Sequence, residues 1–100
     1  MASFTVEHET TLSQAEAYKK VKKFFEENES LKKLDSNLEY SFNDTACSGK
    51  VKGSKFECNL KVVDSSPAKV EVTVSLSLFL TPFKGKIQET LQSKIRQVLD

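Results

Sequence analysis

"VEVTVSLSLFLTPFKGKI", residues 70–87, passes from an alternating apolar and polar pattern to the start of an amphipathic helix. Apolar residues occupy every second position over residues 70–80, and this period predicts a β-strand with one face in a core. Phe79 is the exception because it falls on the polar side. Thr81 then suits the N-cap of a helix, and Pro82 suits the first helical position, where its missing N–H costs nothing.

The segment after Pro82 carries an apolar stripe at helical spacing. The stripe consists of Phe83, Ile87, Leu91, Ile95 and Val98, with Leu99 beside it. Its first turn holds Lys84-Gly85-Lys86, although glycine costs about 1 kcal/mol relative to alanine in a helix. We interpret Gly85 as a position where another backbone packs closely. One alternative is that Lys84 and Lys86 contact an anion or a partner at the helix N-terminus. Another is that the glycine has no particular role there.

Four shorter segments upstream also alternate between apolar and polar residues. They are residues 3–9, 38–42, 47–51 and 56–62. Turn-forming residues separate the later ones, at positions 43–44, 52–55 and 64–68. Strands joined by such short turns predict an antiparallel meander.

A second amphipathic helix is predicted after the first strand. Ser13 followed by Glu16 has the spacing of a capping box. An apolar stripe follows at Ala17, Val21, Phe24 and Phe25. We expect this helix to end near Asn28, and residues 30–34 to add one further helical turn.

These elements predict an α+β fold in the order β-α-β-β-β-β-α. An antiparallel sheet of five strands would have its apolar face covered by the two amphipathic helices. A length of 100 residues predicts a single domain over residues 1–100.

The net charge on its own does not indicate a binding partner. Lysine and arginine total 15 against 14 acidic residues, so no overall charge attracts nucleic acid or an anionic membrane. No apolar run approaches the roughly 18 residues of a membrane span, and the N-terminal residues lack the apolar core of a signal peptide. We expect a soluble cytoplasmic protein with neither a nucleic-acid partner nor a transmembrane segment.

No arrangement of residues predicts catalysis or metal binding. His8 is the single histidine and has no nucleophile or acid motif beside it, and the two cysteines lack zinc spacing. With a two-residue turn at 52–53, Cys47 would lie directly opposite Cys58; with a four-residue loop the two would be diagonal neighbours. We favour two buried cysteines over a redox pair, and expect no catalytic residue, metal or cofactor.

Lysines on the first helix form the other candidate contact surface. "KKVKK", residues 19–23, presents Lys19, Lys20 and Lys23 around the core-facing Val21. Such a run binds phosphate or an anionic surface, or is simply a solvated helix face. The sequence does not show whether it shares a surface with the lysines at residues 84 and 86.

The chain resembles the polyhydroxyalkanoic acid system, or granule-region, family of small bacterial proteins. The resemblance spans nearly the whole chain. It includes "LSQAEAYKKV" at residues 12–21, Tyr40 and Phe42, and "SGKVKG" at residues 48–53. The most specific part is "FKGKI", residues 83–87, after a strand rich in valine and leucine.

The resemblance implies a reduced helix-grip fold, in which a curved antiparallel sheet holds a C-terminal helix. It also implies a non-enzymatic granule-associated or regulatory protein, which binds a protein partner or the surface of a storage-polymer granule. The alternative is a small carrier of hydrophobic ligands or lipids, with a pocket between the sheet and the C-terminal helix. Neither the sequence nor the resemblance sets an oligomeric state.

Overall fold

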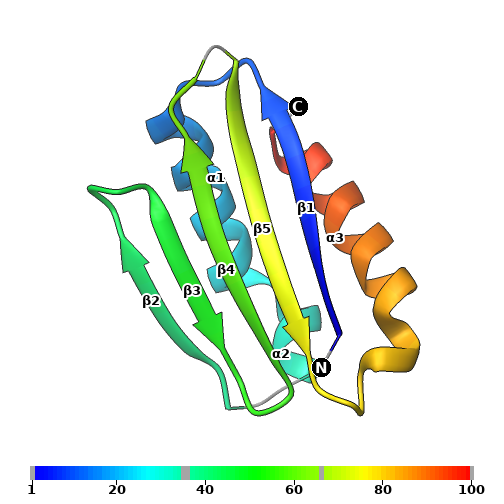
Figure 1. The fold of residues 1–100 in the computed structure, drawn as a ribbon. Coiled ribbons are helices and arrows are strands. Elements are labelled where there is room, and N and C mark those ends of the chain that lie inside the picture. Colours follow the sequence, from blue (N-terminus) through cyan, green and yellow to red (C-terminus); the bar gives the residue numbers. More distant parts are fainter. Residues whose placement is uncertain (1, 35–36, 66, 100) are drawn as a thin grey trace.

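The computed structural model describes residues 2–34, 37–65 and 67–99, and Figure 1 shows their arrangement. The elements are β1 Ala2–Thr10, α1 Gln14–Glu27, α2 Glu29–Leu34, β2 Glu39–Asn43, β3 Ser48–Lys52, β4 Phe56–Val63, β5 Ala68–Leu76, the 3-10 helix η1 Thr81–Phe83, and α3 Lys84–Leu99. This order confirms the prediction, with α2 as the expected further helical turn. The predicted turn at 64–68 includes Ser66, which lies outside the described residues. None of the helices in the described ranges is long and apolar enough to cross a membrane.

The strands form one antiparallel sheet in the order β1-β5-β4-β3-β2. The last four strands make the predicted meander, and β1 pairs along the free side of β5. Both long helices lie on the same face, with α1 across the middle strands and α3 along β1 (Figure 1). The predicted antiparallel sheet packed by two helices is therefore confirmed.

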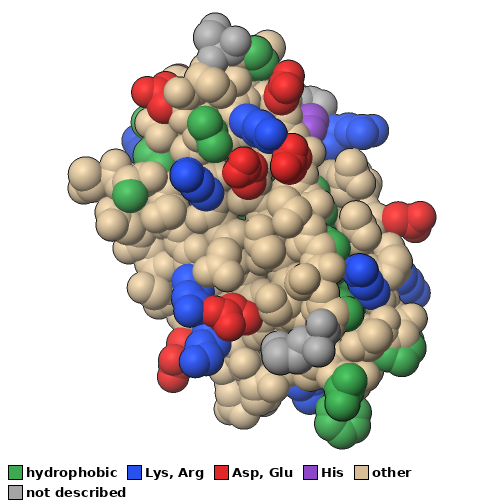
Figure 2. All heavy atoms as spheres, viewed as in Figure 1, with side chains coloured by type: hydrophobic (Ala, Val, Ile, Leu, Met, Phe, Trp, Pro, Cys, Tyr) green, Lys and Arg blue, Asp and Glu red, His purple; other side chains and the backbone are tan. Residues whose placement is uncertain are grey.

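The register of the strands places apolar residues opposite apolar ones on the inner face and polar residues opposite polar ones on the outer face. Val72 lies opposite Val6 on one side and Leu60 on the other, and all three are buried. One residue further on, Thr73 lies opposite Thr5, and their hydroxyl oxygens are 3.2 Å apart on the outer face. The outer face in Figure 2 accordingly shows polar and charged side chains, with few apolar ones. Because side chains alternate along a strand, slipping one strand by one residue would expose its half of the core.

Helix α1 begins and ends where the sequence predicts. The Ser13 side chain accepts a hydrogen bond from the Glu16 amide at 3.2 Å, and the helix ends at Asn28. The side chains of Ala17, Val21 and Phe25 are buried against the sheet. Capping and a regular apolar stripe are local properties, and so they are readable without knowledge of the tertiary contacts.

Strand β5 is shorter than predicted. It ends at Leu76, which lies opposite Ala2 at the start of β1 and opposite Phe56 at the start of β4. Beyond this point the Ser77 amide still donates to the Lys55 carbonyl at 2.8 Å, and the chain then turns. The predicted burial of Leu78 is wrong, since its side chain is 80% exposed.

The start of the C-terminal helix also differs from the prediction. Thr81 is not an N-cap: its hydroxyl donates to the Ser77 carbonyl at 3.0 Å, and Leu80 occupies the N-cap position of η1. Pro82 is the second residue of η1 and not the first helical residue as predicted. A 3-10 turn has three residues rather than 3.6, so it shifts the helical phase. Phe83 is therefore 55% exposed, whereas Leu91 and Ile95 later in the apolar stripe are buried.

The two cysteines do not face one another, contrary to both predicted hairpins. Val51 lies opposite Cys58, and the Val62 amide donates to the Cys47 carbonyl at 3.0 Å. The two cysteines are thus offset by four residues along β4, about 13 Å at strand spacing. A disulfide requires Cα atoms within about 7 Å. Both thiols are free and buried, as the favoured interpretation expected.

Candidate functional site

The predicted lysines occupy two separate places. Lys19, Lys20 and Lys23 are exposed on α1, while Lys84 and Lys86 lie at the start of α3. Lys20 and Lys23 line one of the two cavities described below, Lys86 lines the other, and Lys94 lines both. Contact with a ligand or partner by any of these five residues remains a prediction.

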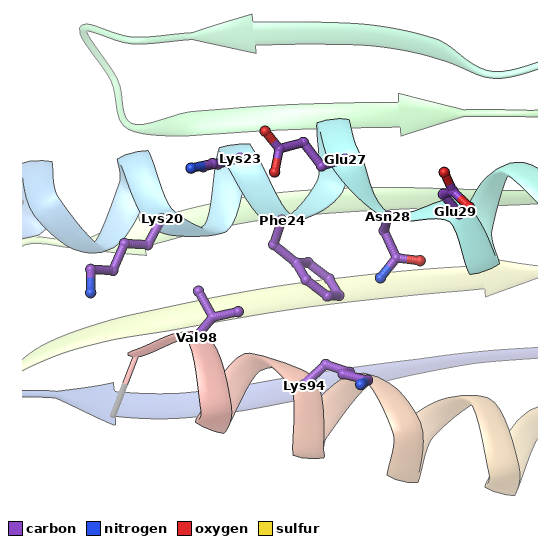
Figure 3. A pocket seen from close by; sticks show the side chains of 8 residues that line it. All are labelled: Lys20, Lys23, Phe24, Glu27, Asn28, Glu29, Lys94 and Val98. Atoms are coloured by element: carbon purple, nitrogen blue, oxygen red, sulfur yellow. The ribbon is translucent and has the colours of Figure 1, made fainter.

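The first cavity is an open groove between α1 and α3, which we call the α1–α3 groove. It has a volume of about 630 Å³ and is lined by Lys20, Lys23, Phe24, Glu27, Asn28, Glu29, Lys94 and Val98. Figure 3 shows Phe24 and Val98 pointing toward one another across it. Three lysines and two glutamates nearly cancel in charge. Phe24 and Val98 are the apolar residues among the described residues that line this open groove, and charged side chains make up most of the rest.

The second cavity lies between the inner face of the sheet and α3, and we call it the sheet–helix pocket. Its volume is about 440 Å³. Its apolar lining consists of Phe24, Phe56, Cys58, Val74, Leu76, Leu80, Phe83, Ile87 and Leu91. Its polar lining consists of Asn28, Lys33, Lys86, Thr90 and Lys94. The pocket is therefore an apolar chamber with polar side chains from helical elements at its margin.

The lengths of the elements explain why a chamber exists here. Helix α1 ends at Glu27, and α2 follows after a break at Asn28. The strand residues near Phe56 and Leu76 lie at the same end of the sheet, opposite one another. That end is left to the start of α3, which reaches it through η1 rather than by a straight helix. Part of the apolar face of the sheet consequently lines a pocket instead of packing directly against a helix.

The charges lining the sheet–helix pocket have one sign. Lys33, Lys86 and Lys94 contribute ammonium groups, and no carboxylate side chain is among the described residues that line it. Thr90 adds a hydroxyl. Opposite charges attract more strongly beside an apolar chamber than in bulk water. The pocket is therefore suited to a molecule with an apolar body and an anionic or strongly polar end.

Cys58 is the only thiol that lines this pocket among the described residues, and it is chemically quiet. Burial raises the pKa of its thiol to about 12, and the nearby charge of Glu57 adds to the shift. The thiolate is the nucleophilic form, so the thiol is a poor nucleophile near neutral pH. Cys58 therefore acts here as an apolar wall.

His8 is not part of the sheet–helix pocket. It lies opposite Val70 on the β1 side of the sheet and lines neither cavity. Of the apolar residues at alternate positions over 70–80, Val74, Leu76 and Leu80 line the pocket, whereas Val70 and Val72 do not.

The close-packing interpretation of Gly85 is wrong. A Cβ atom built on Gly85 would meet no other atom within 4 Å, and the residue is exposed. The predicted explanation assumed a straight helix docked on the strand from its first turn. Because η1 precedes α3 and carries its first turn away from the sheet, Gly85 faces open space.

Gly49 is the glycine that does meet a close neighbour. It pairs with Phe42 across β2 and β3, and a Cβ there would lie 2.8 Å from Cε1 of the Phe42 ring. The amino group of Lys22 lies 5.2 Å from the centroid of the same ring. Gly49 thus lets an aromatic ring lie flat on the sheet beneath α1.

A polar contact ties α1 to the turn between β2 and β3. The Tyr18 hydroxyl donates to Asp44 at 2.6 Å, and the Lys22 ammonium lies 3.1 Å from the same carboxylate oxygen. Hydrogen bonds from Tyr18 and Lys22 hold the pKa of Asp44 below its usual value. Burial and then the Asp44 contact raise the pKa of Tyr18. This contact positions α1 and lies outside the pocket.

The sequence does not predict several residues that line the sheet–helix pocket, including Asn28, Lys33 and Lys94. A usable signal was present, because the predicted end of the first helix near Asn28 leaves later strand residues without a cover. Lys33 and Lys94 carry no local pattern that distinguishes them from other surface lysines. Only the tertiary arrangement brings them to one margin.

Comparisons with known proteins give a family and a fold. A protein-family model described as "Putative polyhydroxyalkanoic acid system protein (PHA_gran_rgn)" matches residues 4–99. Among curated proteins, none matches this sequence.

Two solved structures share the architecture. The crystal structure of TTHA0849 from Thermus thermophilus is similar over 98% of this chain and 92% of its own, with a TM-score of 0.58 and 12% identity. That of Ara h 8.0201 is similar over 97% of this chain and 94% of its own, with a TM-score of 0.63 and 9% identity. At such identities the likeness shows the fold alone, and it agrees with the predicted helix-grip-like arrangement.

Proposed function

The chain belongs to the polyhydroxyalkanoic acid system family, and on that premise we propose that it is a non-enzymatic protein that binds a small amphipathic molecule in the sheet–helix pocket. This was the second of the two functions considered from sequence. We place it first because one observation carries it: an apolar chamber of about 440 Å³ between the sheet and α3. Ligand pockets typically fall between about 300 and 1,000 Å³.

The lining indicates the chemistry of the ligand. Apolar walls such as Val74, Leu76 and Leu91 would bury an alkyl chain, at a gain of about 0.8 kcal/mol per buried CH₂. Lys86 and Lys94 on α3 would meet an anionic group at the polar margin. A medium-chain carboxylic acid has both parts.

The family context supports the same class of ligand. A polyhydroxyalkanoic acid is a polyester whose building blocks are hydroxy acids, and each has a carboxylate and an apolar side chain. We infer that an alkanoate or hydroxyalkanoate of this kind occupies the pocket, in the cytoplasm of a bacterial cell. Binding requires no cofactor, and the proposal includes no chemical step on the ligand.

A series of ligands tests this proposal by isothermal titration calorimetry. Dodecanoate should bind, dodecanol should bind more weakly because it lacks the charge, and acetate should not bind because it lacks the chain. The Lys86→Gln/Lys94→Gln double variant should reduce the preference for dodecanoate over dodecanol. The paired variant Lys19→Gln/Lys20→Gln, on α1, is the matched control and should leave the preference unchanged. Absence of dodecanoate binding to the wild-type chain would reject the proposal.

The second proposal is that the chain binds a protein partner or the surface of a storage-polymer granule. Family membership supports it, and so do the three lysines of α1, which remain solvent-exposed. Co-sedimentation with isolated granules tests it, with the triple variant Lys19→Gln/Lys20→Gln/Lys23→Gln for comparison. Recovery of the wild-type chain only in the supernatant, with no retained partner, would reject it.

A further inference from the structure

The connection between β5 and α3 exposes three large apolar side chains, which we call the apolar tip. Leu78 is 80% exposed, Phe79 is 82% exposed and Phe83 is 55% exposed. They are the large hydrophobic side chains classed as exposed within the described ranges. Figure 2 shows hydrophobic side chains protruding at this end of the molecule, where Figure 1 places the connection between β5 and α3. Isolated apolar side chains are common on protein surfaces, but a cluster at one end usually marks a contact site.

The backbone holds the apolar tip in a defined conformation. The amides of Leu80 and Thr81 both donate to the Ser77 carbonyl, at 3.0 and 3.1 Å, and the Phe83 amide donates to the Leu80 carbonyl at 2.9 Å. The Leu80 side chain is buried and anchors the middle of the turn in the core. The turn therefore presents Leu78 and Phe79 outward by its geometry, rather than through loss of structure.

The charges around the apolar tip are positive. Residues 77–88 include Lys84 and Lys86 and contain no acidic residue. The β3–β4 connection brings Lys55 to the same end, because the Ser77 amide donates to the Lys55 carbonyl at 2.8 Å. An apolar cluster with lysines beside it complements a surface that has an apolar interior and an anionic exterior.

We propose that the apolar tip docks the protein on a lipid surface with anionic head groups. Leu78 and Phe79 enter the acyl layer, and Lys84 and Lys86 lie against the head groups. A protein partner would also cover apolar side chains, but Lys84 and Lys86 beside the tip favour the anionic lipid, since the first acidic residue along α3 is Glu89. Phe83 and Lys86 also line the sheet–helix pocket, so docking would bring the margin of the pocket to the lipid surface. Docking itself does not depend on whether the pocket holds a ligand.

Flotation of the full chain with lipid vesicles tests this inference. The wild-type chain should float with vesicles that mix phosphatidylglycerol and phosphatidylcholine, and float less with phosphatidylcholine alone. Leu78→Ser/Phe79→Ser should lower the vesicle-bound fraction by roughly tenfold or more, because two large apolar side chains no longer leave water. Phe79→Ser alone provides a milder variant if the double variant is less soluble. Thermal unfolding should show that both variants keep their fold.

Matched charge variants distinguish vesicle binding through the apolar tip from nonspecific attraction between any lysine and the anionic lipid. Lys84→Gln/Lys86→Gln should weaken binding to mixed vesicles, and Lys19→Gln/Lys20→Gln on α1 should not. Equal loss in both pairs would overturn the inference, as would undiminished binding by Leu78→Ser/Phe79→Ser. The inference would also be overturned if the wild-type chain bound neither vesicle type but self-associated through the tip. In that case a second copy of the chain covers the tip. These vesicles contain no polymer and no pocket ligand is added, so the result does not depend on the proposed ligand.

Discussion

At the scale of single residues, Gly85 offers the simplest test of the structure. Its Cβ position faces open space and its φ is not positive. Alanine should therefore fit without strain and restrict the unfolded chain. We expect Gly85→Ala to raise the free energy of unfolding by about 0.5–1 kcal/mol. Urea denaturation measures this, and a clear loss of stability would mean that Gly85 is closely packed after all.

Gly49 should respond in the opposite direction to the same substitution. A methyl group there meets the Phe42 ring, so either the ring or the strand must move. We expect Gly49→Ala to lower the free energy of unfolding by about 1–3 kcal/mol, the usual range for overpacking. The same substitution should cost less in a Phe42→Leu background, and a double-mutant cycle measures that coupling. Equal costs in both backgrounds would contradict the contact.

At the scale of elements, the contact of Asp44 with Tyr18 and Lys22 should make the docking of α1 pH-dependent. The folded pKa of Asp44 is lowered, so its stabilising contribution is present above the unfolded value of about 3.9. That contribution is lost as the pH falls through the lower folded pKa. Wild-type and Asp44→Asn chains should therefore differ in stability near neutral pH and converge in strong acid.

Urea unfolding of both chains near neutral pH and in strong acid measures this difference. Asp64→Asn removes the same charge at an aspartate beyond the end of β4, outside the contact with Tyr18 and Lys22, and is the matched control. If Asp44→Asn differs from the wild-type chain equally at both pH values, the carboxylate charge does not contribute to the docking of α1.

Local patterns predicted whole elements well, but they predicted the ends of elements only where capping residues set them. The alternation at residues 56–62 gave the buried face of β4, and Ser13 gave the start of α1, because each depends on neighbours in sequence. The end of β5 at Leu76 depends on where β1 and β4 begin. The alternation continues past that point in the sequence, but the sheet does not. The offset between Cys47 and Cys58 likewise depends on where the turn falls. The Gly53 amide donates to the Phe56 carbonyl at 2.9 Å, so the two-residue turn lies at 54–55 and not at the predicted 52–53.

At the scale of the whole molecule, the pocket follows from a mismatch between helices and sheet. A sheet of five strands presents more apolar face than α1 covers, and α3 completes the cover at an end reached through a 3-10 turn. The sequence predicted the layers and left a pocket as an alternative. It did not predict the pocket's place, since Phe24, Phe56 and Leu91 converge only in three dimensions.

The same arrangement links the two proposals without making one depend on the other. The sheet–helix pocket accounts for the apolar interior and the lysines of one sign at its margin. The apolar tip assigns a role to Leu78 and Phe79, which are exposed and line neither cavity. Phe83 and Lys86 contribute to both features, so a ligand leaving the pocket would have a short path to a surface on which the tip is docked.

The central claim is that the sheet–helix pocket binds an amphipathic ligand, and one calorimetric comparison tests it most directly. Ile87→Trp enlarges a half-buried side chain that lines the pocket, whereas Gln92→Trp places the same ring at an exposed position on α3. Both folds are first verified by thermal unfolding. Dodecanoate should bind the wild-type and Gln92→Trp chains with the same Kd, and bind Ile87→Trp at least roughly tenfold more weakly. Undiminished binding to Ile87→Trp, or no binding to the wild-type chain, would contradict the claim.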